Sequence, residues 1–216
     1  MLYNRRKIIL AILETFGGTL NKISLQKLLF LFTRNQEEKS FEFLPYKFGC
    51  YSFQLNQDLH TLKNYGYIVE EDDDYYRLSS IKENYATLLN LFDNQILYQI
   101  KQDFINYTTE DLIRYTYKKY PYYAINSTII TDNRIGLSND EIKKIQLQKK
   151  NILNKSNNIS CVFSFGYEGV MFKLNNGRTI KGSNILKQKN VTISNDMHIK
   201  EICDEFKEFM FEVSVK

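Results

Sequence analysis

The chain has 216 residues, a net charge of +4 and a hydrophobic content of 43%, enough for one large globular domain or two small ones. Its three cysteines, Cys50, Cys161 and Cys203, are widely spaced and form no cysteine–histidine cluster, which argues against a zinc site or a disulfide framework. The apolar run near the N-terminus is too short for a signal or membrane segment, so we expect a cytoplasmic protein that does not use a membrane.

Charge is unevenly distributed along the chain. Residues 1–40 carry seven basic residues against three acidic ones, residues 41–139 carry nine against thirteen, and residues 140–216 carry thirteen against nine. Within the last part, residues 142–190 contain ten basic residues and a single acid, Glu168. A basic surface of this kind favours a polyanionic partner such as nucleic acid.

The first forty residues predict two helices. Apolar residues recur at helical spacing over residues 3–16, and the Gly17-Gly18 pair would end this first helix. A second helix would begin with Ser24 as its N-cap and continue to Phe32. A charged loop is expected over residues 35–40.

A third helix is predicted within the stretch LPYKFGCYSFQLNQDLHTLKNYGY, residues 44–67. A short extended piece would turn at Gly49–Tyr51, and Ser52 would then cap a helix that ends near Gly66. Its buried stripe would comprise Phe53 or Leu55, Leu59 and Leu62.

Two β-prone pieces, residues 67–69 and 75–78, follow on either side of an acidic tip over residues 70–74. This pattern predicts a β-hairpin. Three helices followed by a hairpin is the element order of a winged helix-turn-helix, in which the third helix is the recognition helix and the hairpin is the wing.

The middle of the chain predicts a helical extension. A long helix is expected over residues 81–106, and a second one would open at Thr108 or Thr109 and end at Pro121. After a loop over residues 131–136, a basic helix is expected over residues 138–156.

The tail changes to a β pattern. A strand is expected over residues 159–165, followed by a hairpin of residues 170–174 and 178–181 around Asn175-Asn176-Gly177, and a last helix over residues 194–211. The predicted fold class is α+β. We expect a winged-helix domain at 1–80, a helical extension and linker at 81–156, and a small basic α+β module at 157–216.

The predicted third helix carries side chains suited to base recognition. Amide, imidazole and ammonium groups can hydrogen-bond to base edges in the major groove, and here they belong to Gln54, Asn56, Gln57, His60 and Lys63. Phosphate contacts are expected from basic residues elsewhere, namely Arg5, Arg6, Lys27, Lys149, Lys150, Lys173, Arg178, Lys181 and Lys187. The alternative is that the third helix presents an ordinary solvated face.

No set of residues indicates catalysis, a cofactor or a metal. His60 and His198 lie far apart without acids or cysteines at ligand spacing, and the motif GYEG, residues 166–169, lacks the pattern of a phosphate-binding loop. The acidic run over residues 70–74 lacks the spacing of a calcium loop. Five carboxylates at a wing would repel phosphates, so either the wing points away from the duplex or the fold binds a protein partner instead.

Several long phrases, among them RRKIILAILETFGGTLNKISLQKLLFLF, residues 44–67, EDLIRYTYKKYPYYAINSTI and VFSFGYEGV, resemble a family of uncharacterised bacterial proteins. That family joins a winged-helix-like N-terminal region to a domain of unknown function that opens with a GYEG strand. Here a hairpin pattern follows GYEG and the family's Asp-Val-Arg motif is absent. The resemblance therefore implies the N-terminal half of the family with a different, shorter tail that lacks the site of the family's α/β domain.

A fainter similarity links LQKLLFLF and YKFGCYSFQLNQDLHTLKNYGYI to the Panacea-type antitoxin domain. Three functions follow from these observations. The first is a non-enzymatic protein that binds double-stranded DNA, as a regulator or as an accessory subunit that brings a partner from the same operon to DNA, for example in a defence or toxin–antitoxin system. The others are a protein-binding adaptor or antitoxin-like module, and a nucleic-acid-processing enzyme.

Overall fold

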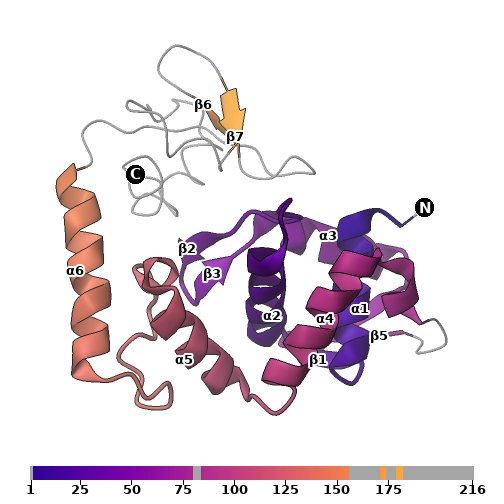
Figure 1. Ribbon diagram of the computed structural model, residues 1–216, viewed down its shortest axis with the longest axis horizontal. Coiled ribbons are helices and arrows are strands. Elements are labelled where there is room, and N and C mark those ends of the chain that lie inside the picture. The colour runs from indigo at the N-terminus through magenta and orange to yellow at the C-terminus, as the bar shows by residue number, and fades with distance from the viewer. Residues whose placement is uncertain (1, 80–83, 156–170, 174–178, 182–216) are drawn as a thin grey trace. The chain divides into compact units, whose positions relative to one another are not determined.

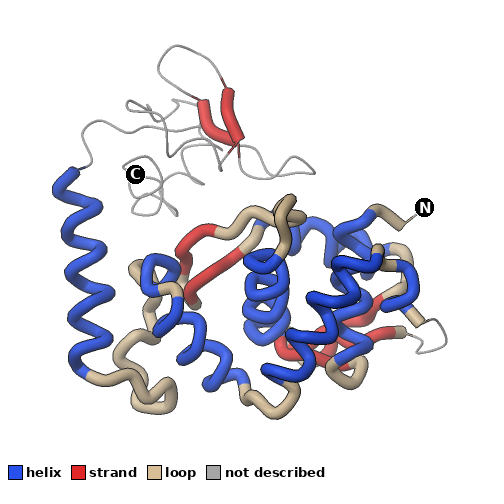
Figure 2. Tube along the Cα trace, viewed as in Figure 1, coloured by secondary structure: helices blue, strands red, loops and turns tan. Residues whose placement is uncertain are grey.

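Figure 1 shows the computed structural model of the chain, in which residues 2–79, 84–155, 171–173 and 179–181 are described. Helices predominate, and the strands form one three-stranded sheet and two hairpins (Figure 2). The predicted α+β class is confirmed. The chain divides into two compact units, the first made of residues 2–41 and 55–116, the second of residues 42–54 and the described residues from 117 on.

Helix α1 (Asn4–Thr15) is the centre of the first unit. Every residue from Ile8 to Leu13 is completely buried, as expected of a helix that is apolar on all sides. Gly17 and Gly18 end it with positive φ angles of 91° and 82°, and the Gly18 amide donates to the Leu13 carbonyl at 2.7 Å. The first predicted helix is thus confirmed.

Helix α2 (Lys22–Asn35) begins three residues earlier than an N-cap at Ser24 would place it. The cap is Asn21, whose Oδ1 accepts a hydrogen bond from the Ile23 amide at 2.9 Å. Ser24 lies inside the helix and is buried, and its hydroxyl lies 2.8 Å from that of Thr109. The prediction of Ser24 as the cap is therefore wrong, because its hydroxyl serves a tertiary contact.

The three-stranded sheet has the order β1-β5-β4 and is antiparallel throughout. Strands β4 (Ile68–Glu71) and β5 (Tyr75–Leu78) form the predicted hairpin, and Asp72 and Asp73 make its turn with positive φ angles. Strand β1 (Thr19–Asn21) has no counterpart in the sequence predictions. It pairs with β5, which lies more than fifty residues away in the sequence, so no local sequence pattern predicts it.

Helix α3 (Phe53–Asn64) follows Ser52 directly, as predicted. Leu55, Leu59 and Leu62 form its buried stripe, whereas Phe53 is only half-buried. Of the two candidates for the first position of the stripe, Phe53 and Leu55, the buried one is therefore Leu55. The chain leaves the helix through Gly66, whose φ is 73°.

The single helix predicted over residues 81–106 is wrong. A 3-10 turn, η1 (Tyr85–Leu88), is separated from helix α4 (Leu91–Phe104) by Asn90, whose side chain caps α4 through the Asp93 amide at 2.8 Å. Helix α4 packs on α1 and α2 through Ile96, Leu97, Ile100 and Phe104, all buried. Leu88 and Phe92, by contrast, are exposed.

Helix α5 (Thr109–Lys119) opens at Thr108, one of the two predicted positions. The Thr108 hydroxyl accepts from the Asp111 amide at 3.2 Å, and the Asp111 carboxylate accepts from the Thr108 amide at 3.1 Å. The helix ends before Pro121, which starts the 3-10 turn η2 (Pro121–Ala124).

In the second unit, β2 (Leu44–Tyr46) and β3 (Gly49–Tyr51) form a hairpin. The turn expected at Gly49–Tyr51 is wrong, since these residues are a strand and the chain reverses at Lys47 and Phe48, before Gly49 with its φ of 89°. The hairpin contacts η2. The backbone of Lys47 is held in place because its carbonyl accepts a hydrogen bond from the Thr128 amide at 2.9 Å.

Helix α6 (Asn139–Lys155) is the predicted basic helix. Ser138 and Glu141 cap it reciprocally, with the Ser138 amide donating to the Glu141 carboxylate at 2.7 Å. Strands β6 (Met171–Lys173) and β7 (Thr179–Lys181) pair antiparallel, as the predicted hairpin requires. Its tip, the strand predicted at 159–165 and the helix predicted at 194–211 lie outside the described residues.

Candidate nucleic-acid interface

The outer face of α3 is a continuous polar arc. At 100° per residue, its exposed side chains cover about a third of the helix circumference, opposite the buried leucines; they are Asn56, Gln57, His60, Lys63 and Asn64. Four of the five base-recognition residues expected from the sequence, Asn56, Gln57, His60 and Lys63, therefore share one accessible surface. We call it the α3 face.

Gln54, the fifth of these residues, does not belong to the α3 face. It is 7% exposed, and its Oε1 accepts a hydrogen bond from the Glu42 amide at 2.7 Å. The side chain therefore holds the backbone at the start of the second unit and cannot reach a base edge. Its prediction as a recognition residue is corrected on this ground.

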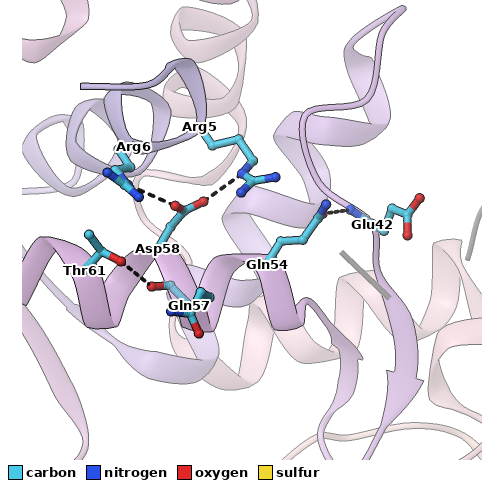
Figure 3. A network of polar contacts seen from close by, with 7 residues as sticks. All are labelled: Arg5, Arg6, Glu42, Gln54, Gln57, Asp58 and Thr61. Atoms are coloured by element: carbon cyan, nitrogen blue, oxygen red, sulfur yellow. Dashed lines mark hydrogen bonds and ion pairs between the residues drawn. The ribbon is translucent and has the colours of Figure 1, made fainter. Parts of the chain in front are cut away.

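A buried carboxylate fixes α3 against α1. Asp58, 1% exposed, accepts a hydrogen bond from Arg5 Nε at 2.7 Å on Oδ2 and another from Arg6 Nε at 3.0 Å on Oδ1. Figure 3 shows the two guanidinium groups converging on Asp58 from α1. Because buried charges require partners, this triad sets the rotation of α3 and thereby the direction in which the α3 face points.

The same triad changes the roles expected for Arg5 and Arg6. Arg6 is 2% exposed, so it is a structural residue that cannot contact a phosphate, and its predicted role is corrected. Arg5 is partly accessible, with 17% of its side chain exposed. Its guanidinium also lies 5.9 Å from the centroid of the Phe41 ring, a distance at which a cation–π attraction is significant.

Lys27 is a further correction. It is 1% exposed, because α2 is enclosed on all sides from Ser24 to Thr33. A lysine inside a helix of this kind cannot make the predicted phosphate contact. Helical spacing alone does not predict this burial, because it does not show which other elements cover the helix.

The acids of the β4–β5 hairpin are partly neutralised by neighbouring cations. Glu70 accepts hydrogen bonds from Lys22 and from Lys63, and these bonds lower the pKa of Glu70 to about 2. Glu71 pairs with Arg77. Only the turn acids, residues 72–74, project without a cation among the ion pairs of the described residues. The negative charge is thus concentrated at the tip of the hairpin.

Lys63 and His60 are both positioned by neighbours. The ammonium group of Lys63 is held toward the hairpin by Glu70, so it joins the α3 face to β4. The His60 Nδ1 lies 3.2 Å from the Asn64 amide nitrogen. When that amide donates to Nδ1, the neutral ring carries its proton on Nε2 and offers a donor to a ligand.

The remaining expected phosphate contacts lie in the second unit. Lys149 is half-buried on α6, where Lys143 and Lys144 are exposed. Lys150 is in α6, Lys173 in β6 and Lys181 in β7, but only their backbone is described. Arg178 and Lys187 lie outside the described residues. The basic stretch as a whole stays a prediction.

No group of three or more His, Cys, Asp or Glu side chains within the described residues is arranged to hold a metal ion. No helix among them combines the length and apolar character needed to cross a bilayer.

No protein-family model matches the chain, and no curated protein or solved structure matches it either. The resemblances to the GYEG family and to the Panacea-type domain therefore stay predictions. What the chain does must be inferred from its own geometry.

Proposed function

We propose that the chain is a non-enzymatic, cytoplasmic DNA-binding protein whose first unit is a winged helix-turn-helix. The order α1-β1-α2-α3-β4-β5, with β1 closing the sheet beside the hairpin, supports this assignment because it is the order in which such domains place a recognition helix before a wing. The chain differs from a minimal version by the β2–β3 hairpin inserted between α2 and α3.

The observation that carries the proposal is the α3 face. Asn56 and Gln57 offer amides that can pair with adenine edges, and His60 offers a single donor or acceptor. These side chains are exposed on a helix whose rotation is fixed by the buried Asp58. A fixed polar arc with Lys63 as its one ammonium group suits base recognition, in which hydrogen-bond geometry matters more than net charge.

Affinity for the phosphate backbone would come from basic side chains in both units. Lys63 lies at its edge, and Lys7 and Arg34 of the first unit are at least partly accessible. The exposed lysines of α6 and the basic stretch over residues 142–190 would add sequence-independent contacts. Such a protein acts as a regulator, or as an accessory subunit that brings a partner encoded in the same operon to DNA.

A second function, that of a protein-binding adaptor or antitoxin-like module, is favoured by the tip of the hairpin. Asp72, Asp73 and Asp74 are all exposed there, and three adjacent carboxylates repel a phosphate backbone but attract a basic protein surface. Under this alternative, α3 and the hairpin together would grip a protein partner.

Selection from a random-sequence duplex pool tests the recognition helix. The wild-type chain should enrich a defined motif, and the double variant Gln57→Ala/His60→Ala should lose that enrichment while keeping its affinity for bulk duplex. Gln99→Ala, an exposed glutamine on α4, is the matched control and should enrich the same motif as wild type. If the double variant enriched the same motif as wild type, α3 would not be the recognition helix.

A further inference from the structure

Helix α4 has a second apolar face that points into solvent. Three large side chains, two on the helix and one at its C-cap, recur at intervals of seven residues, and they are strongly exposed: Leu91 at 78%, Tyr98 at 65% and Ile105 at 45%. Phe92, in the first turn of the helix, is exposed by 48%, and Leu88, in the preceding turn η1, by 41%. We call the line Leu91-Tyr98-Ile105 the α4 seam.

The α4 seam lies opposite the core and is free of charge. At 100° per residue, the buried positions Ile96, Leu97, Ile100 and Phe104 occupy the other side of the helix. Between the three seam residues stand Gln95 and Gln102, both exposed and neutral. The exposed charges of α4, Lys101 and Asp103, lie on its two flanks.

A surface helix normally places its charged side chains opposite its buried stripe. Helix α4 does the reverse, since the position farthest from the core carries leucine, tyrosine, isoleucine and glutamine. Exposed apolar area of this kind on one helix, rimmed by charges, is typical of an interaction surface. The spacing of seven residues is that of a helix–helix seam.

We infer that the α4 seam is the interface through which two copies of this chain pair, with the two α4 helices antiparallel and Tyr98 on the two-fold axis. Leu91 and Ile105 are each seven residues from Tyr98, so each Leu91 meets Ile105 of the second copy. The face is therefore complementary to itself, as an isologous interface requires.

The chemistry of the seam also fits a second copy. Bringing two such faces together buries no charge at the centre, and a glutamine amide both donates and accepts, so Gln95 and Gln102 satisfy each other across the axis. The five exposed apolar residues offer about 500 Å² per copy, given about 200 Å² for a large side chain. Two copies thus bury about 1,000 Å², near the lower limit for a specific interface, which predicts a dimer that dissociates in the micromolar range.

Sedimentation of the full chain from about 1 to about 100 µM tests the inference. The wild type should pass from monomer to dimer over this range. Tyr98→Glu places two carboxylates face to face on the axis and should weaken the dimer at least about 30-fold, as the loss of a central contact does. The matched control is Tyr65→Glu, because Tyr65 is equally exposed at 67% on another surface, and it should dimerise like wild type.

The orientation is tested by disulfide trapping in a chain whose Cys161 and Cys203 are changed to serine. A mixture of Leu91→Cys and Ile105→Cys chains should cross-link to the mixed dimer, and neither variant alone should do so. A wild type that stays monomeric at about 100 µM, or a dimer unaffected by Tyr98→Glu, overturns the interface. Cross-linking of Leu91→Cys to itself overturns the antiparallel arrangement.

Discussion

Arg6 and Asp58 form an ion pair from which water is almost completely excluded. The Arg6 Nε lies 3.0 Å from Asp58 Oδ1, and the two side chains are 2% and 1% exposed. They stand on α1 and α3, 52 residues apart in the sequence. Removal of one partner from such a pair leaves the other charge buried and uncompensated, which costs more than the pair itself contributes.

Asp58→Asn should therefore destabilise the protein by about 3 kcal/mol or more, because the neutral amide removes the carboxylate with which the buried guanidinium of Arg6 forms its ion pair. Urea unfolding followed by circular dichroism measures this. Asp103→Asn is the control, since Asp103 is exposed and accepts a hydrogen bond from the exposed Gln99, and it should change stability by about 0.5 kcal/mol or less. Equal effects of the two substitutions would contradict a buried ion pair.

Glu70 makes the stability of the fold depend on pH in the acidic range. Its pKa is about 2 in the folded protein, because Lys22 and Lys63 donate hydrogen bonds to its carboxylate, and 4.5 is its ordinary value. A carboxylate with a lowered pKa stabilises the fold above the unfolded-state pKa, and this contribution is lost as the pH falls from about 4.5 to about 2. Since Glu70 keeps a fifth of its surface exposed, solvent screening reduces the contribution to about 1 kcal/mol.

Glu70→Gln should accordingly be less stable than wild type by about 1 kcal/mol at neutral pH and equally stable near pH 2. Denaturant unfolding of both proteins at several pH values gives the difference in their free energies of unfolding. The contributions of the other carboxylates are the same in both proteins and cancel in this difference. Asp73→Asn at the hairpin turn is a suitable control, because asparagine tolerates its positive φ of 56°. A difference between Glu70→Gln and wild type that is the same at both ends of the pH range would contradict the ion pair with Lys22 and Lys63.

Gly66 ends α3 with a φ of 73°, and a Cβ at this position would meet no atom within 4 Å. Any cost of Gly66→Ala is therefore backbone strain alone, about 1 kcal/mol. Gly66→Asn should cost less, since asparagine enters the left-handed region more readily than alanine. The ranking glycine, asparagine, alanine in thermal unfolding is the expected result. A Gly66→Ala protein as stable as wild type would show that α3 ends in another conformation.

Local patterns predicted the elements of the first unit well. The apolar spacing of α1 and α3, the acidic hairpin turn and the cap at Thr108 all follow from residues close together in sequence. Strand β1 did not, because three residues without a period of their own become a strand only by pairing with β5. The break at Asn90 was missed for a related reason, since leucines on both sides continue the helical spacing across it.

The candidate site was predicted less completely, for a physical reason that Arg6, Lys27 and Gln54 share. Each is a polar side chain on a helix, and helical spacing alone does not show that a second layer of structure covers it. Arg6 is matched by Asp58, Gln54 is matched by a backbone amide of Glu42, and Lys27 lies in a helix enclosed on all sides. Asn56, Gln57, His60 and Lys63 lie opposite the buried leucines, where the spacing of α3 is informative.

The most direct test of the proposed function is the salt dependence of binding to duplex DNA, measured by fluorescence anisotropy with a labelled mixed-sequence duplex of about 30 base pairs. A complex that neutralises about three phosphates should lose about 40-fold in affinity between about 50 and about 200 mM salt. No detectable binding at about 50 mM salt, or an affinity that does not change over this range, would contradict DNA binding. Either result would favour the alternative, in which the acidic hairpin tip binds a protein partner.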